Sequence, residues 1–376
     1  MVKKNDKSFL RVIKPEVDFS KTEKSSNDFL HYHASNNLKN YISRGTLLQD
    51  NNDSLYVYQI SMGSHTQTGI VAAVSIKEYN DGLIKKHEFT RPDKEDDRTM
   101  HMEKTKANTG PVFLTFKNNG EFNHYLSNIM IREKDIDFEA EDGTKHILWK
   151  VADKDFLTSI ISYFKKINSL YIADGHHRAA SASRLLKMYH SNNPNHIGVE
   201  PYNYFLATIF PHDQVKILSY NRLVKDLAGN NEEQFFNKVK EKFYVVKLSD
   251  RKEPKKRRNF SMYLNNHWYA LKAKANLNSK DSVESLDASI LQTHILDPIL
   301  KISDSRTNDR IDFVGGARGL EELERRCHLD SKVAFALFPV LIDDLLKVAD
   351  EGKIMPPKST WFEPKLRSGL IVRLLE

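Results

Sequence analysis

The sequence predicts a mixed α and β fold, on three observations. Two strand-like runs, Leu55 to Ile60 and Gly69 to Ile76, are separated by a polar turn, which is typical of a β-hairpin. In the centre, the apolar run from Ser169 to Ala173 is followed by the turn Asp174-Gly175 and then by helical spacing of apolar residues from His176 to His190. No repeat with a period of about 20 to 50 residues occurs, which excludes a solenoid or a propeller.

The other elements follow in order along the chain. Residues 1–53 are polar and rich in Lys, Asn and Ser, and we expect them to wrap around the rest of the protein. Acidic residues directly after Pro92 indicate the start of a helix, because the helix dipole favours negative charge there. Further helices are predicted at 121–131, 155–167, 232–243, 283–300, 320–326 and 340–349, and further strands at 111–116, 202–210, 215–218, 259–264, 267–271 and 333–338.

The length and the composition set the size and the class of the protein. A chain of 376 residues predicts two or three packed units, since a domain typically has about 100 to 200 residues. We divide it into 1–53, 54–212 and 213–376, with the last part forming a further α/β unit. Hydrophobic residues make up 40% of the chain, enough for a sizeable core, and this excludes a wholly disordered protein.

Hydropathy and cysteine content indicate the compartment. The longest apolar stretches are shorter than the ~20 residues that a membrane-spanning helix needs, and no apolar signal segment follows Met1. We therefore expect a cytoplasmic protein without a membrane partner. Cys327, the single cysteine, cannot form an internal disulfide, and its helical surroundings favour an ordinary packed thiol over a nucleophile.

The net charge is +7, from 57 basic and 50 acidic residues. The one dense basic run, Arg251 to Arg258, contains a proline and lies between two strand-like segments, which is typical of a solvated turn. A nucleic-acid partner is therefore not expected. A modest positive excess suits an anionic small-molecule substrate.

The sharpest motif for function is the turn between the central strand and its helix. Gly175 permits a tight turn, and the amides of the first helical turn form a site for an anion together with His176, His177 and the guanidinium of Arg178. These residues predict a phosphate-binding site. Asp174 has three open interpretations: a helix cap, a magnesium ligand or a group that orients a histidine.

Two other segments carry residues suited to the same chemistry. Glu88, beside His87, is the best candidate for a base that accepts the proton of a hydroxyl. The alternative interpretation is that Glu88 is an ordinary solvated glutamate at the end of a strand. Arg91 and Arg98 could neutralise phosphate charge, although an ion pair of Arg98 with Asp96 or Asp97 is an equally good interpretation. Near the C-terminus, two prolines stiffen a loop that presents one cation and two hydroxyls. We expect these groups to bind either the phosphates of a nucleotide or the compound that accepts a phosphoryl group. They belong to Lys358, Ser359 and Thr360.

The sequence contains no zinc-binding motif but offers carboxylates for magnesium. The histidines show no HExxH spacing, and a lone cysteine cannot supply a thiolate set, so zinc is not expected. Magnesium accompanies nucleotides and needs only one or two carboxylates, for which Asp174 and Glu88 are available. Neither a P-loop nor the motif set of protein kinases occurs, so a bound nucleotide would be held by a different structural motif.

The motifs together resemble a known family. The block Ala173 to Arg178 (ADGHHR), with His87-Glu88-Phe89-Thr90 upstream and Met355 to Thr360 (MPPKST) near the end, looks like domain-of-unknown-function family 1015. This resemblance, from about Ser8 to the C-terminus, implies a ParB/sulfiredoxin-like core in residues 54–212. The superfamily binds nucleotide phosphates at a Gly-x-x-Arg helix start and includes kinases of free serine. Gly175 and Arg178 match that pattern.

The chain departs from the family pattern in two places. Family members usually carry a further N-terminal segment with a Pro-Tyr-Asp-Val-like motif, and this chain begins near the segment that follows it, so part of the family site is expected to be missing. Asn221 precedes Arg222 where the family tends to have a histidine, so one titratable group is lost there.

The resemblance and the residues together predict an ATP- or ADP-dependent kinase with Mg²⁺, acting on a small hydroxylated metabolite, with free L-serine as the best guess. Glu88, His87 and His177 are the expected catalytic residues. Two other functions stay open: a ParB-like nucleotide-binding switch or DNA-associated protein without phosphoryl transfer, and a phosphate-ester hydrolase.

Overall fold

The computed structural model describes residues 5–20 and 26–376, which form two compact units. The first contains Met1–Val215 together with Pro364–Glu376, and the second contains Lys216–Glu363. The first unit is therefore made of two separate stretches of chain, and its last thirteen residues follow the whole second unit in sequence.

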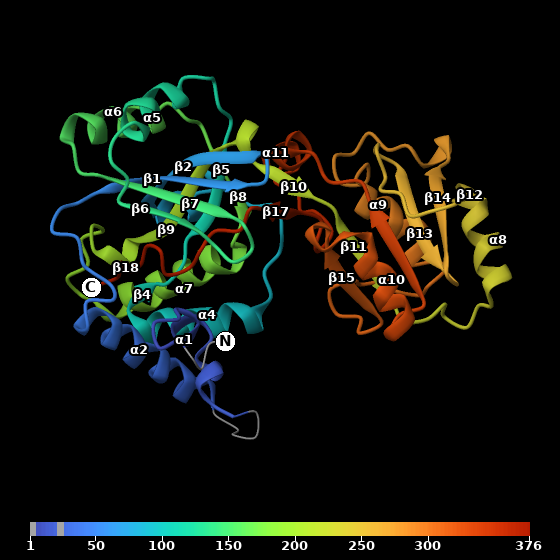
Figure 1. The fold of residues 1–376 in the computed structure, drawn as a ribbon, viewed down its shortest axis with the longest axis horizontal. Coiled ribbons are helices and arrows are strands. Elements are labelled where there is room, and N and C mark those ends of the chain that lie inside the picture. The colour runs from blue at the N-terminus through green and yellow to red at the C-terminus, as the bar shows by residue number, and fades with distance from the viewer. Residues whose placement is uncertain (1–4, 21–25) are drawn as a thin grey trace. The chain divides into compact units, whose positions relative to one another are not determined.

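An eight-stranded sheet forms the centre of the first unit, in the order β3-β8-β5-β9-β2-β1-β7-β6 (Figure 1). The predicted hairpin is confirmed as β1 and β2, which pair from Tyr56 opposite Val71 to Met62 opposite His65. Two neighbouring pairs, β3–β8 and β5–β9, are parallel. The strands are β1 Leu55–Met62, β2 His65–Ser75, β3 Ile84–Lys85, β5 Val112–Phe116, β6 Ile136–Glu139, β7 Lys145–Val151, β8 Leu170–Asp174 and β9 Tyr204–Pro211.

One face of this sheet carries the main hydrophobic core. A single row of paired residues crosses five strands, and all of its members belong to one buried cluster: Val57, Ile70, Ile209, Leu114 and Ile172. Side chains alternate between the faces of a sheet, so one register fixes which residues of all five strands enter the core.

Among the described residues of the first unit, seven α-helices accompany this sheet. The predicted strand, glycine turn and helix are confirmed as β8, Gly175 and α7. In Figure 1, α4 and α7 lie side by side, with α2 against α4. The helices are α1 Leu10–Ile13, α2 Asn27–Ser43, α3 Ile76–Asn80, α4 Pro92–Thr105, α5 Phe122–Met130, α6 Lys154–Phe164 and α7 His176–Asn192.

The N-terminal residues contribute their own small core. Val12 from α1 packs with Leu38 and Tyr41 from α2 and with Ala107 of β4 (Ala107–Asn108). The strand β18 (Arg373–Leu374), close to the C-terminus, pairs with β4. Segments close to both ends of the chain, α1 and β18, therefore pack in the first unit.

The second unit is built on a six-stranded sheet, β12-β14-β13-β16-β11-β15, and all of its pairs are antiparallel. A second, two-stranded sheet joins β10 to β17. The strands are β10 Lys216–Leu218, β11 Tyr220–Val224, β12 Phe243–Lys247, β13 Asn259–Leu264, β14 His267–Ala273, β15 Ile311–Gly315, β16 Val333–Leu337 and β17 Trp361–Glu363, and the α-helices are α8 Glu232–Lys242, α9 Asp287–Leu291, α10 Gly319–Leu329 and α11 Ile342–Asp350.

One predicted helix of the second unit is wrong. A single helix was expected over 283–300, but α9 has only five residues and continues as a π-helix over Gln292–Leu296. The amide of Asp297 donates to the carbonyl of Gln292, a spacing of five residues, which shifts the apolar side chains away from ordinary helical positions. Both segments are nevertheless buried in the same core.

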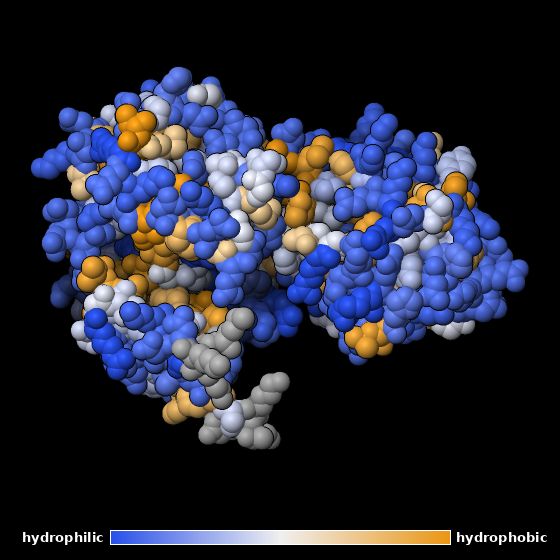
Figure 2. Space-filling view, in the orientation of Figure 1, coloured by the Kyte–Doolittle hydropathy of each residue, from blue (hydrophilic) through white to orange (hydrophobic). Residues whose placement is uncertain are grey.

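Among the described residues, no helix has the length and apolar character to cross a bilayer. Figure 2 shows a largely hydrophilic surface with small apolar groups scattered over it. Cys327 is partly buried on α10, and burial raises the pKa of its thiol to about 12, which keeps it protonated.

Candidate functional site

The topology of the first unit brings three chain segments to one edge of its sheet. The strands β3 and β8 are parallel, so their carboxyl ends reach the same edge, where they lead to His87-Glu88 and to Asp174-Gly175. Because β5 is antiparallel to β8, its amino-terminal end, after Gly110, lies at this edge too. Residues far apart in sequence therefore meet around the start of α7.

The turn into α7 depends on a glycine. Gly175 has a φ of 98°, in the left-handed region that favours glycine. It occupies the N-cap position, so the interpretation of Asp174 as the helix cap is wrong. One carboxylate oxygen of Asp174 accepts from the Gly175 amide at 2.8 Å, and the other pairs with the ammonium of Lys365 at 2.9 Å. Asp174 is therefore held by partners within the first unit.

His87 and His176 form a buried pair. Their rings lie edge to face with centroids 4.5 Å apart, and the amide of His87 donates to Nε2 of His176 at 3.5 Å. Burial lowers the pKa of His87 to about 4 and also lowers that of His176. Both imidazoles are therefore neutral at physiological pH and can each offer a lone pair.

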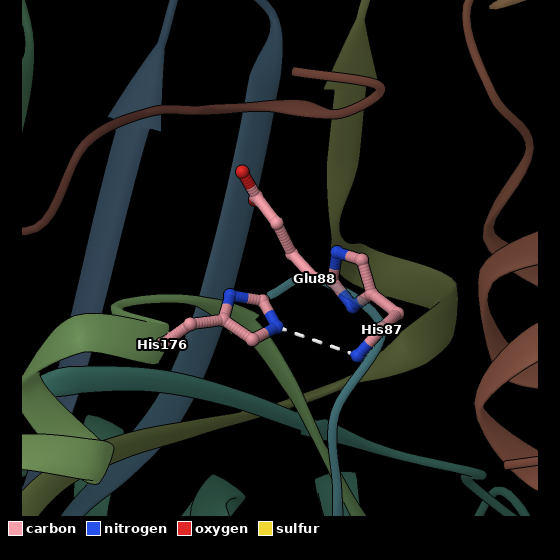
Figure 3. Close-up of side chains that lie close together, drawn as sticks. All are labelled: His87, Glu88 and His176. Carbon is pink, nitrogen blue, oxygen red and sulfur yellow. Dashed lines mark hydrogen bonds between the residues drawn. The ribbon is translucent and has the colours of Figure 1, made fainter. Parts of the chain in front are cut away.

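Glu88 completes this cluster. One ligand atom from each of His87, Glu88 and His176 lies within 4.8 Å of the others. Figure 3 shows the carboxylate of Glu88 extending past the two rings, with the three side chains arranged around a common region. Glu88 is partly exposed, whereas both histidines are buried.

His177 forms a hydrogen bond with the start of a neighbouring helix. Its Nε2 accepts a hydrogen bond from the amide of Arg91 at 3.1 Å, and Arg91 is the N-cap residue of α4. The side chain of Arg91 is exposed and pairs with Asp93 at 3.0 Å, so this guanidinium already has a carboxylate partner. In the structure, His177 therefore positions the start of α4.

Arg178 is held by a glycine carbonyl and a serine. Its Nη1 donates to the carbonyl of Gly110 at 3.2 Å, and its Nη2 lies 3.5 Å from the hydroxyl of Ser368. A Cβ added at Gly110 would lie 2.9 Å from Nη1 of Arg178, so only glycine leaves room for this contact. Burial, followed by the nearby charge of Arg98, lowers the pKa of Arg178 to about 10, which still leaves it charged at pH 7.

Arg98 faces the same space as Arg178. The interpretation of Arg98 as a partner of Asp96 or Asp97 is wrong: Asp96 pairs with Arg184 at 2.6 Å, and Asp97 lies 3.4 Å from a ring nitrogen of His31. Within residues 5–20 and 26–376, neither Arg98 nor Arg178 has a carboxylate in ion-pair range.

The two guanidiniums border one cavity of about 20 Å³. This volume holds roughly one water molecule, so a phosphate group would need a side chain such as the partly exposed Arg98 to move aside. The lining residues are Arg98, His101, Met102, Asn108, Thr109, Gly110, Val112, Arg178, Phe205 and Leu206.

The predicted residues near the C-terminus lie in the second unit. Lys358 adopts a φ of 57°, and its ammonium lies 5.8 Å from the centre of the Tyr220 ring. The hydroxyl of Ser359 donates to the carbonyl of Pro356 at 2.6 Å, and Thr360 directly precedes β17. The buried Arg222 donates to the carbonyl of Pro357 at 3.2 Å and so holds this loop. A role of the loop in phosphate binding stays a prediction.

Sequence analysis missed two residues that position Arg178. Gly110 stands before Pro111 just ahead of β5, and a Gly-Pro pair indicates only a turn. Ser368 comes from the last stretch of chain and meets Arg178 across 190 positions. Such long-range contacts leave no local pattern, although the glycine itself could have indicated a close approach of another group.

The comparison with protein families identifies the chain. A family model described as "Protein of unknown function (DUF1015)" matches residues 1–289. The chain belongs to this family. The family resemblance expected from the ADGHHR and His87-Glu88 motifs is thereby confirmed over the matched residues. The MPPKST motif lies beyond residue 289, so its part in the resemblance stays a prediction, as does membership of the ParB/sulfiredoxin superfamily. A comparison with curated proteins found no match.

Several solved structures are similar to this DUF1015 protein at low identity. "SbnI with C-terminal truncation from Staphylococcus aureus" is 11% identical with a TM-score of 0.45, and the match covers 81% of this chain and 87% of that one. "Free serine kinase in complex with AMP" is 14% identical with a TM-score of 0.39, over 79% and 90% of the chains. A conserved hypothetical protein from Pyrococcus furiosus is 12% identical with a TM-score of 0.37, over 79% and 94%. These similarities are too weak to assign residues of the site.

Proposed function

We propose that this protein is a nucleotide-dependent phosphotransferase that acts on a small hydroxyl compound, with free L-serine as the first acceptor to test. The observation that supports this most is the pair of guanidiniums, Arg98 and Arg178, on one cavity beside the start of α7. Two neighbouring cations without carboxylate partners repel each other, and an anion between them would relieve that repulsion.

The surroundings of Arg178 favour a phosphate group as this anion. Arg178 is on the first turn of α7, where amide groups add positive potential to that of the two guanidiniums. A guanidinium can bind two phosphate oxygens at once, and the contacts of Arg178 with Gly110 and Ser368 hold its guanidinium in place. The nucleotide, ATP or ADP, would bring Mg²⁺ with it.

Glu88 is the proposed base. Phosphoryl transfer depends mostly on position and charge, and the base must orient the acceptor hydroxyl and take up its proton late in the reaction. A carboxylate does this with an ordinary pKa. Glu88 follows β3 at the same edge of the sheet as Arg178, which is consistent with one site for donor and acceptor.

The substitution Arg178→Ala tests this assignment. We expect the affinity for ATP or ADP, measured by calorimetry, to fall by about 10- to 150-fold, because a hydrogen bond to a charged group contributes about 1.5–3 kcal/mol. Arg184→Ala is the matched control: Arg184 is on the same helix, but it is half-exposed and its charge is already paired with Asp96. Unchanged nucleotide affinity in Arg178→Ala, with the fold intact by circular dichroism, would contradict the proposal.

An activity assay separates the three functions. Labelled ATP or ADP is incubated with the protein, Mg²⁺ and a panel of hydroxylated amino acids, and the products are separated. Phosphoserine supports the kinase, and another phosphorylated compound would change the acceptor only. Release of free phosphate alone indicates a hydrolase, and tight binding without turnover indicates a switch.

A further inference from the structure

We propose that His87, Glu88 and His176 form a binding site for a divalent transition-metal ion such as Zn²⁺, Mn²⁺ or Fe²⁺. The three ligand atoms lie within 4.8 Å of one another. Small side-chain movements would therefore allow all three to lie about 2.0–2.2 Å from one shared ion, which is the metal–ligand distance that such ions require. Two imidazoles and a carboxylate leave at least one position for water or substrate, as in metal sites that perform catalysis.

The state of both histidines suits metal binding. An imidazole must be neutral to bind an ion, and both rings are buried, an environment that disfavours the charged form. His87 also forms a hydrogen bond with the backbone of Ile172 on β8. Since a backbone carbonyl can only accept, the ring donates its proton there, and the lone pair is on the other nitrogen. Metal-binding histidines are typically oriented by such a contact.

The charges around the cluster also agree with a bound cation. Asp174 lies two residues before His176, so its carboxylate, which pairs with Lys365, adds negative charge beside the cluster. The hydrogen bond that His176 accepts from the His87 amide is long, at 3.5 Å, so its loss on metal binding would cost little. Lys86, the neighbour of His87 in sequence, adds a positive charge nearby, whereas Glu88 brings a carboxylate into the cluster itself.

The ligand types distinguish this site from the magnesium expected with a nucleotide. Mg²⁺ prefers oxygen ligands and keeps several waters, whereas imidazole nitrogens suit Zn²⁺ and its neighbours. Asp174, the predicted magnesium ligand, offers carboxylate oxygens only, and in the structure it pairs with Lys365. The metal site does not require phosphoryl transfer, although it shares Glu88 with the proposed reaction. A carboxylate that binds an ion through one oxygen keeps the second for a hydroxyl proton, so both roles are compatible.

Metal binding can be measured directly on the full chain. The purified protein is treated with a chelator, dialysed and titrated with Co²⁺, with detection by calorimetry and by visible absorption. We expect a single equivalent to bind, with the spectrum of a nitrogen- and oxygen-ligated ion, and Zn²⁺ to displace it. His176→Asn should abolish this binding, and Glu88→Gln should weaken it by at least about tenfold.

Two control variants make the result specific. His124→Ala removes an exposed histidine of α5 and should leave the Co²⁺ titration unchanged. Arg178→Ala should bind Co²⁺ as wild type does. The nucleotide affinity of Arg178→Ala and the Co²⁺ affinity of His176→Asn therefore test two separate sites. Wild-type protein that binds no Co²⁺, or His176→Asn that is folded and binds as wild type does, would overturn the proposal. Displacement of Co²⁺ by equimolar Mg²⁺ would overturn the choice of metal class.

Discussion

At the scale of single residues, the second unit holds an unusual carboxylate. Asp287 begins α9 and is 7% exposed. One of its oxygens accepts from the amide of Arg258 at 2.7 Å, but Oδ2 has no hydrogen-bond partner among the described residues. The neighbouring Arg257 pairs with Asp344 at 2.8 Å instead. Burial therefore raises the pKa of Asp287 to about 7, because the uncharged form loses less on leaving water.

This carboxylate predicts a loss of stability as the pH rises from about 4 to about 7. The pKa of Asp287 is raised in the folded state from 3.8 to about 7, so its contribution favours folding below pH 4 and is lost as the pH rises through 7. We expect Asp287→Asn to raise the free energy of unfolding at pH 8 relative to wild type, by at most roughly 4 kcal/mol, and to change it much less at pH 4. Urea unfolding at both pH values measures this.

Asp343→Asn is the control for this substitution, because Asp343 lies on α11 in the same unit but is exposed. It should give the same change at both pH values. Asp287→Asn that destabilises the protein equally at pH 4 and pH 8 would contradict the prediction. Favourable contacts of the Asp287 carboxylate would then exceed the free-energy cost of burying its charge.

At the scale of elements, the turn between β8 and α7 determines where the histidines and Arg178 lie. Gly175 and Gly82 both have positive φ, of 98° and 80°, but a side chain at Gly82 would meet no atom within 4 Å. We expect alanine at either position to cost about 1–2 kcal/mol of folding free energy, since a Cβ is disfavoured in this backbone region. Denaturant unfolding of the two variants measures this cost.

Only the variant at the turn should change binding. Gly175 directly precedes the first turn of α7, so relief of the strained φ in Gly175→Ala should displace the amides of that turn, and nucleotide affinity should fall. Gly82→Ala should bind nucleotide as wild type does. Equal affinities of all three proteins would show that the amides opening α7 do not contact the ligand.

The same turn shows how far the sequence predicts this fold. The central strand, glycine and helix could be predicted because each depends on local spacing. The meeting of this turn with His87 could not be derived in that way, because it depends on the parallel pairing of β3 with β8. The helix expected over 283–300 failed since hydropathy alone does not separate an α-helix from a π-helical continuation.

At the scale of the whole molecule, the first unit is complete only when the last residues of the chain, Pro364–Glu376, pack in it. Arg373 in β18 donates to the carbonyls of Tyr204 and Pro201, at 3.0 and 2.7 Å. Leu375 is buried in the main core of that unit. Ser368, which contacts Arg178, belongs to the same stretch. The candidate phosphate site therefore depends on residues that are synthesised after the whole second unit.

Arg373→Ala tests this dependence. Removing the guanidinium leaves two carbonyls without their charged donor, and we expect the first unit to lose about 1.5–3 kcal/mol of stability. Hydrogen exchange should then become faster at amides of β4, β9 and β18 and stay unchanged in the sheet of the second unit, because the contacts of Arg373 lie in the first unit. Arg318→Ala, at an exposed arginine of the second unit, should leave exchange in the first unit unaltered. Faster exchange throughout both sheets in Arg373→Ala would show instead that the two units unfold as one.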